Sequence, residues 1–340
     1  MPTPKLSTQS AAAVIARMVK TSGVARVFGL CGGHIMPIWM RLHAEGLHIV
    51  DVRDERAAVY MAHAHAELTG ELGVALVTAG PGVTNAMTGI ANAHVARASV
   101  LVLSGTPPLP QENRGALQDI VHTDLVSSIT RYARTVRHRD LVPQELSEAI
   151  ARARGHGGEA GPVYLDFPAD TLRAEVSTAV QLPEYVSAGA GPLVVPDEAS
   201  INAAVELLWQ AKRPLVISGR GARGAGEVLT ALLDQTQAAY LDTGESRGLV
   251  PDDHPSVVGA MRGTVMGQAD LIVTIGRRLD FQLAYGSPAV FGQAKFLRIA
   301  DCVAELRDNR RGAAELLGDT RATLEAMLRI AGDRQPSTDA

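Results

Sequence analysis

The sequence has 340 residues, 46% of them hydrophobic, so its length suggests roughly two domains of ordinary size with ample material for their cores. A formal net charge of -4 provides no basic field for binding nucleic acid or an anionic membrane. No apolar run reaches the roughly 18 residues of a membrane span, and the N-terminus lacks a secretory hydrophobic segment. Two cysteines, Cys31 and Cys302, are too few for a disulfide framework. We therefore expect a soluble cytoplasmic protein with reduced thiols.

The first half of the chain alternates between segments with helical spacing of apolar residues and short apolar runs typical of strands. This alternation is typical of a parallel sheet covered by helices on both faces. In chain order we predict a helix at residues 7–20, strands at 25–30 and 47–52 flanking a helix at 35–44, a helix at 57–68, a strand at 73–78, a helix from about 86 to 96, a strand at 99–104, a helix at 143–154 and a strand at 162–167.

Glu55 lies where a strand is followed by a helix. The apolar run 47–52 predicts a short buried strand, and the charged cluster of Arg53, Asp54, Glu55 and Arg56 follows it directly. In open α/β sheets, ligands bind outside the carboxyl ends of the strands, so Glu55 is a candidate site residue. A glutamate in the first helical turn is also favoured by the helix dipole without any other role.

Two glycine turns and one long loop follow other predicted strands. Gly32 and Gly33 follow the first strand, and Gly80 and Gly82 flank Pro81 after the strand at 73–78. Glycines at such positions allow tight turns and close approach of another group to the backbone. The polar loop at 105–124 is unusually long, and long loops in compact domains are often functional.

The alternation stops between residues 168 and 196, where Pro, Gly, Ala and Ser predominate, and it then resumes. We therefore predict an α/β protein of two doubly wound domains with mainly parallel sheets: a first domain at 1–180, a linker at 181–196, a second domain at 197–332 and a polar, disordered tail at 333–340. In the second domain we predict helices at 199–211, 227–235 and 320–330 and strands at 214–218, 239–241, 271–275 and 295–299.

Gly219, Gly221 and Gly224 have the spacing of a dinucleotide-binding turn, and Asp242 ends the next strand, where a ribose-binding acid is expected. Many α/β domains carry this turn without a nucleotide, so we do not predict one. His63 and His65 are two residues apart, which places them on different faces of a helix. We predict no metal site in this chain.

Several segments, in this order and spacing, resemble the thiamine-diphosphate enzymes of the acetolactate synthase and pyruvate oxidase group. The segments are residues 28–35, 53–56, 73–85 and 161–168, and the resemblance covers essentially the whole chain. The Gly-His-Ile sequence at 33–35 and the Thr-Ala-Gly sequence at 78–80 are most similar to benzaldehyde lyase. Residues 247–255 and 295–301 also resemble 2-hydroxyacyl-CoA lyases and oxalyl-CoA decarboxylases.

The resemblance implies a family of three domains, of which this sequence has the first two. The first binds the aminopyrimidine of the cofactor, and the third binds its diphosphate through Mg²⁺ with a Gly-Asp-Gly motif and a later Asn. Because Gly-Asp-Gly does not occur in this sequence, we expect either a fragment or one subunit of a split enzyme. The partner would then be a diphosphate-binding subunit that holds the Mg²⁺, in a heterotetramer.

The resemblance also implies roles for particular residues. Glu55 corresponds to the glutamate that bonds a ring nitrogen of the pyrimidine and activates thiamine diphosphate. His34 resembles a histidine beside the reacting substrate, and Gln118 resembles an active-site glutamine that orients the donor carbonyl or the adduct hydroxyl. The cofactor-binding candidates, besides Glu55, are Gly32, Gly33, Thr78, Gly80, Pro81, Gly82 and Asn85. In some relatives the central domain carries ADP or FAD, which would contact residues 219–226 and Asp242 here.

From this resemblance we expect a lyase or transferase that cleaves or forms a C–C bond next to a carbonyl group. The substrate would be a 2-hydroxy ketone, a 2-oxo acid or a 2-hydroxyacyl-CoA. One alternative is carboligation of two 2-oxo acids, as in acetolactate synthase. Another is a non-catalytic nucleotide-binding or regulatory protein.

Overall fold

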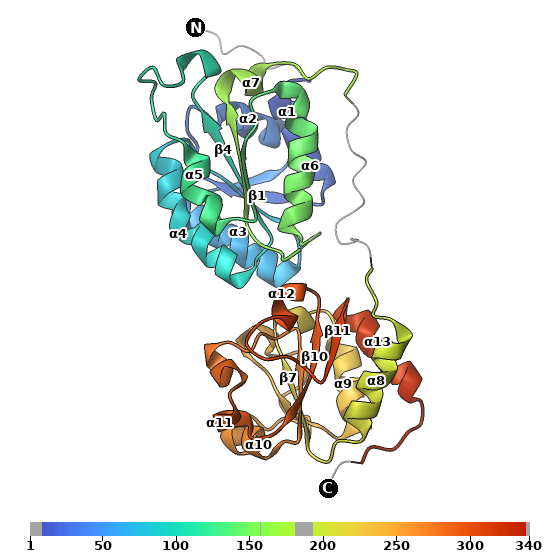
Figure 1. The fold of residues 1–340 in the computed structure, drawn as a ribbon. Coiled ribbons are helices and arrows are strands. Elements are labelled where there is room, and N and C mark those ends of the chain that lie inside the picture. The colour runs from blue at the N-terminus through green and yellow to red at the C-terminus, as the bar shows by residue number, and fades with distance from the viewer. Residues whose placement is uncertain (1–8, 157, 181–192, 338–340) are drawn as a thin grey trace. The chain divides into compact units, whose positions relative to one another are not determined.

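A computed structural model describes residues 9–156, 158–180 and 193–337 of the chain. The chain divides into two compact units, Met1–Gly191 and Pro192–Ala340. Each unit contains one sheet whose paired strands are all parallel, with helices between successive strands (Figure 1). The predicted α/β fold class is therefore confirmed.

The sheet of the first unit has the strand order β2-β1-β3-β4-β6-β5. Strand β2 pairs on one side of β1 and β3 pairs on the other, so the order in which strands are added changes direction at this point. Ligands of α/β proteins bind at such switch points. The strands are β1 (Arg26–Gly29), β2 (His48–Asp51), β3 (Gly73–Leu76), β4 (Val100–Thr106), β5 (Tyr132–Thr135) and β6 (Val163–Pro168). The helices are α1 (Ala11–Thr21), α2 (Met36–Ala44), α3 (Glu55–Thr69), α4 (Pro81–Ala96), α5 (His122–Val126), α6 (Val142–Ala153) and α7 (Ala169–Arg173).

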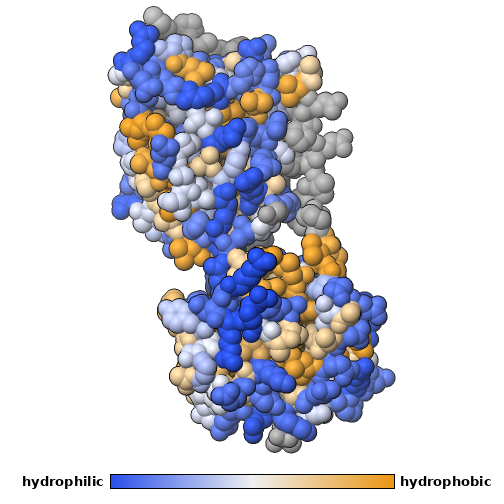
Figure 2. Space-filling model, viewed as in Figure 1, coloured by the Kyte–Doolittle hydropathy of each residue, from blue (hydrophilic) through white to orange (hydrophobic). Residues whose placement is uncertain are grey.

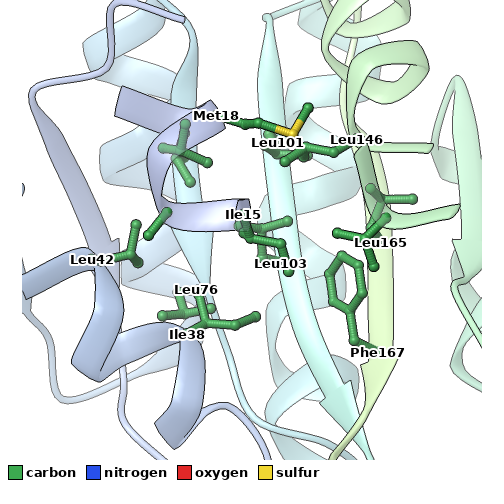
Figure 3. Close-up of a cluster of buried hydrophobic side chains, with 14 of the residues drawn as sticks. Ile15, Met18, Ile38, Leu42, Leu76, Leu101, Leu103, Leu146, Leu165 and Phe167 are labelled. Carbon is green, nitrogen blue, oxygen red and sulfur yellow. The ribbon is translucent and has the colours of Figure 1, made fainter. Parts of the chain in front are cut away.

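Both faces of this sheet are buried, which explains the continuous apolar runs of its central strands. In β4, Leu101 and Leu103 belong to the core beneath α1, α2 and α6, whereas Val100 and Val102 belong to the core beneath α3, α4 and α5. Figure 3 shows the first of these cores, in which Ile15 of α1 lies near Leu103. Successive side chains of a strand point to opposite faces, so a strand between two helical layers has no polar side.

The second unit repeats the same arrangement, with the order β11-β10-β9-β7-β8. The order in which strands are added changes direction between β7 and β9, because β8 pairs on one side of β7 and β9 on the other. The strands are β7 (Pro214–Ser218), β8 (Ala239–Leu241), β9 (Leu271–Ile275), β10 (Lys295–Ala300) and β11 (Ala314–Leu317). The helices are α8 (Glu198–Trp209), α9 (Gly226–Thr236), α10 (Arg262–Gln268), α11 (Pro288–Phe291), α12 (Val303–Leu306) and α13 (Thr320–Ala331). Helices α8, α9 and α13 contribute to one core, and α10 and α11 to the other.

Some predicted elements differ from the structure. The strand predicted as buried, β2, lies at the sheet edge, and its side chains are only partly covered. Helix α4 begins at Pro81 rather than after Asn85, because a proline at the first helical position needs no donor partner for its nitrogen. The long loop ends at His122, where α5 begins, and includes a 3₁₀ turn at Leu109–Gln111.

The elements that were not predicted lie at edges or are very short. Edge strand β5 is polar. The others have at most seven residues each: strand β11 and helices α7, α10, α11 and α12. Most of the predicted linker, residues 181–192, lies outside the described residues, as do residues 338–340 of the tail. The described part of the tail contacts the end of α8, where Ser337 N–H donates to Trp209 O at 3.0 Å.

Figure 2 shows hydrophobic residues in small groups among hydrophilic ones on the surfaces of both units. Within the described residues, no helix combines the length and the apolar character needed to cross a membrane. Cys31 is partly exposed and Cys302 is buried.

Candidate active site

Glu55 and Asn85 meet at the first turns of two helices, α3 and α4, which follow the strands on either side of β1. Glu55 is the first residue of α3, whose N-cap Asp54 accepts the Arg56 N–H at 2.8 Å. Asn85 lies in the first turn of α4. Its amide donates to Glu55 Oε2 at 2.6 Å, a charge-assisted bond that holds the carboxylate in one orientation. Glu55 Oε1 has no such partner among the described residues and lies close to Gly82.

Glycines at two positions let the segments after β1 and β3 pack closely against Thr78. A Cβ added to Gly32 would lie 2.4 Å from the Thr78 side chain, and one added to Gly82 would lie 2.9 Å from Thr78 and 3.4 Å from Glu55 Oε1. Any side chain at these positions would therefore collide with Thr78. The Thr78 hydroxyl is buried and has no hydrogen-bond partner among the described residues. A buried hydroxyl without a partner is rare unless a ligand or water bonds to it.

His34 and Gln118 lie beside the same turn. Gly80 has φ 61° and ψ −117°, and a Cβ on it would lie 2.7 Å from the Gln118 Cβ. Gln118 itself has φ 61°, an uncommon conformation for a residue with a side chain. Burial lowers the pKa of His34 below its usual value, whereas a hydrogen bond to Gln118 raises it. The nearby His122 and Arg173 lower it further, so these groups favour a neutral His34 imidazole.

Below the turn lies a buried network that the sequence analysis missed. His122 Nε2 accepts the backbone N–H of Gly80 at 2.8 Å, and His122 Nδ1 lies 2.9 Å from Asp166 Oδ2. The Tyr164 hydroxyl donates to the same carboxylate oxygen at 3.0 Å. Asp166 in the middle of an apolar strand was the available signal, because a buried carboxylate needs partners.

The structure therefore brings together most of the predicted site residues, at the switch point of the first sheet. Glu55, Asn85, Gly82, Thr78 and Gly32 form one group. Gly80, Gln118 and His34 form a second group, which is linked to the first through the same turn. Gly33 and Pro81 are exposed at its border, and an added Cβ at Gly33 would meet no atom within 4 Å.

The glycine-rich turn of the second unit is explained by packing inside the protein. A Cβ on Gly219 would lie 2.6 Å from Gly276 O, and one on Gly221 would lie 2.7 Å from Gly276 Cα. The close approach that these glycines allow is thus made by the turn after β9. Asp242 pairs with Arg247 at 3.1 Å, and α9 begins only at Gly226. These contacts account for the motif without a nucleotide.

A metal site is also not evident beside Glu55. In the part of the first unit that the structure describes, no three His, Cys, Asp or Glu side chains lie close enough together to hold an ion. The one such group among all described residues consists of Asp301, Cys302 and Glu305, in the second unit.

Comparisons with known proteins match both units. Residues 9–127 match the N-terminal TPP binding domain of thiamine pyrophosphate enzymes, and residues 201–327 match the central domain of the same enzymes. The chain is 34% identical over 324 residues to 2-hydroxyacyl-CoA lyase 1 of Mus musculus, covering 94% of this chain and 55% of the relative. It is 33% identical over 337 residues to the acetolactate synthase large subunit IlvG of Mycobacterium tuberculosis, covering 97% and 60%. The chain thus spans between half and two thirds of the length of these relatives.

Proposed function

This chain belongs to the thiamine pyrophosphate enzymes, and from that premise we propose that it supplies the pyrimidine-binding half of an enzyme that cleaves or forms a C–C bond next to a carbonyl group. The observation that carries the proposal is the Glu55 carboxylate, which Asn85 orients beside a turn that only glycines can form. The unpartnered Thr78 hydroxyl in that turn fits a ligand with polar ring atoms.

In this proposal the residues of the chain bind and orient the cofactor. When bound, thiamine diphosphate would supply a centre that stabilises negative charge on the former carbonyl carbon of the substrate. Glu55 holds a proton at a ring nitrogen of the pyrimidine. Gly32, Gly80 and Gly82 let Thr78 and Gln118 approach the turn closely, and the Thr78 hydroxyl would offer the ring a hydrogen bond.

His34 and Gln118 act on the substrate side. A neutral imidazole at pH 7 can accept a proton from a substrate hydroxyl and return it, and the lowered pKa of His34 keeps it in that form. Gln118 raises the pKa of His34, and His34 Nδ1 is buried without a hydrogen-bond partner among the described residues, so it is open to a substrate group. The remaining amide group of Gln118 orients the substrate carbonyl or hydroxyl.

The names of the relatives support a substrate class. Relatives named 2-hydroxyacyl-CoA lyase 1 and 2-hydroxyacyl-CoA lyase 2 support cleavage of a 2-hydroxyacyl-CoA or a related 2-hydroxy ketone. The name acetolactate synthase supports the second candidate, carboligation of 2-oxo acids. The non-catalytic alternative predicts tight binding of ADP or a flavin without any effect of thiamine diphosphate.

We further propose that a diphosphate-binding unit with a Gly-Asp-Gly motif and a later Asn completes the site and holds Mg²⁺, as a partner subunit in a heterotetramer. Magnesium requires a set of oxygen ligands that the described residues around Glu55 do not offer. Exposed apolar residues border the site and suit a protein partner: Met36, next to Cys31 at 3.8 Å, and Leu117 and Val121, which flank Gln118 in the loop. A chain with only two cysteines suits a reducing compartment such as the cytoplasm.

The proposal is tested by Glu55→Gln in the assembled enzyme. The amide keeps an oxygen that can accept from Asn85, so the fold should be unchanged, but it cannot share a proton with the pyrimidine. We expect turnover to fall by at least about 100-fold, the lower range for loss of acid–base catalysis. Glu148→Gln, the same change at an exposed residue of α6, is the matched control. Wild-type turnover of Glu55→Gln would contradict the assignment.

The partner proposal is tested by titration calorimetry with thiamine diphosphate and Mg²⁺. The isolated chain should bind the cofactor poorly and show no turnover, because the diphosphate carries most of the charge of the cofactor. Co-expression with a diphosphate-binding subunit of roughly 200 residues, an ordinary domain size, should restore both. Micromolar binding together with full turnover of the isolated chain would refute the need for a partner.

A further inference from the structure

The buried network of His122, Asp166 and Tyr164 has no role in the chemistry proposed above, yet it touches the site at Gly80. His122 is 1% exposed and Asp166 is 0% exposed. Burying a carboxylate is costly, and replacing such a network by apolar residues is often neutral for stability. Core packing therefore gives no reason for this histidine and this aspartate.

We propose that His122, held by Asp166, is a positioning residue that sets the geometry of Gly80 and Gln118 in the reaction pocket. This inference rests on the proposed function. It assigns His122 no contact with substrate or cofactor. Its role is to hold in place the Gly80 turn and the Gln118 loop, which lie beside each other at the candidate active site.

The direction of the hydrogen bonds defines the state of the imidazole. The backbone N–H of Gly80 can only donate, so His122 Nε2 must be the unprotonated nitrogen of the ring. His122 Nδ1 then carries the proton and donates it to Asp166. Burial and the adjacent Asp166 raise the pKa of Tyr164 well above its usual value, so its hydroxyl stays protonated and also donates to Asp166. The carboxylate therefore selects one neutral tautomer of His122.

That tautomer holds a backbone conformation that is otherwise unfavourable. The φ and ψ of Gly80 belong to a region open to glycine, which loses more conformational entropy on folding than any other residue. The bond from Gly80 N–H to His122 is a restraint on this turn from below. Thr78 and Asn85 lie on either side of it along the chain, so the restraint also affects the Glu55 group.

The same histidine anchors the loop that carries Gln118. His122 is the first residue of α5, four positions after Gln118. A second restraint closes a turn within the loop, because the Asp119 carboxylate accepts the Asn113 N–H at 2.6 Å. Gln118, with its positive φ, lies inside this turn, four residues before His122, and packs on Gly80. One side chain thus joins the Gly80 turn to the Gln118 loop, and through Gln118 to His34.

The test compares His122→Gln with His122→Leu. Glutamine can accept the Gly80 N–H with its carbonyl oxygen and donate to Asp166 with its amide, whereas leucine fills the space and does neither. By amide hydrogen exchange of the full chain, the Gly80 amide should stay protected in His122→Gln and exchange about tenfold faster or more in His122→Leu. In the assembled enzyme, kcat of His122→Leu should fall on the order of 100-fold, with a smaller change in KM, as expected for a displaced reacting group. His122→Gln should recover most of that loss.

A measurement on the wild-type chain keeps the test decisive if His122→Leu does not fold. Nitrogen-15 NMR of the imidazole should show a neutral ring with the proton on Nδ1, and the other tautomer would overturn the inference. Equal kcat in wild type and His122→Leu, or equal losses in the leucine and glutamine variants, would also overturn it. Glu55→Gln separates the two ideas: if that variant is fully active, the proposed function fails. If it is inactive while His122→Leu retains full kcat, only the positioning role fails.

Discussion

Replacing Gly80 by alanine should damage the site through two separate effects. An L-residue at φ 61° and ψ −117° carries backbone strain of about 1–3 kcal/mol. In addition, the new Cβ would lie 2.7 Å from the Gln118 Cβ and 3.2 Å from its Cα, which is closer than carbon atoms approach without displacement. Gln118 must therefore move away, and its bond to His34 should weaken.

Gly70→Ala provides a matched control for the backbone effect. Gly70 ends α3 with φ 73° and ψ 1°, and an added Cβ there would meet no atom within 4 Å. Its cost should be the left-handed strain alone, about 1–2 kcal/mol. The two variants thus share a positive φ but differ in crowding.

Calorimetric unfolding of the full chain and steady-state kinetics of the assembled enzyme provide the readouts. For a unit of this size, 1 kcal/mol corresponds to about 2–4 °C, so Gly80→Ala should lower the Tm of the first unit by roughly 2–12 °C. Its kcat should fall by about tenfold or more, whereas Gly70→Ala should lose only stability. If Gly80→Ala is no less stable than Gly70→Ala, the crowding argument is wrong. If it is less stable but fully active, Gln118 does not belong to the reaction pocket.

Two further predictions address the border and the proton chemistry of the site. Gly33→Ala should leave the Tm unchanged, because the added Cβ would meet no atom within 4 Å and the φ of Gly33 is not positive. In the assembled enzyme the same variant should weaken cofactor binding, because Gly33 is proposed to lie against the cofactor. Unchanged affinity would remove Gly33 from the site. NMR titration of His34 should give a pKa below 6.5, and Gln118→Ala should lower it further, because the bond to Gln118 raises it; a rise in that variant would contradict the geometry. The pKa of His34 is lower in the folded state than in the unfolded state. The stability contributed by its neutral form is therefore present above pH 6.5 and is lost as the pH falls through the folded-state pKa. Unfolding experiments across that pH range can follow this loss.

Local patterns in the sequence determined the layered architecture. The strands at Pro214–Ser218, Ala239–Leu241 and Leu271–Ile275 have the predicted bounds, because continuous apolar runs between breakers identify strands that are buried on both faces. The other edge strands, β2, β5 and β11, were predicted less well than edge strand β8. Strand β5 pairs only with β6, remains polar and has no apolar pattern of its own. Strand β2 was predicted as buried from its apolar residues, although its place at the edge leaves it partly exposed.

The position of Glu55 at a strand–helix junction also followed from the sequence, whereas its partner did not. Only the packing of α3 against α4 decides that Asn85 bonds to Glu55, thirty residues away along the chain. The same holds for His122 and Asp166, which are separated by 44 residues. The glycines of the second unit show the converse: their spacing matches that of a dinucleotide-binding turn, but the turn after β9 occupies the space they leave. Sequence periodicity reports which residues are buried, but the partners of buried polar groups depend on how distant segments cross, and only the tertiary structure decides that.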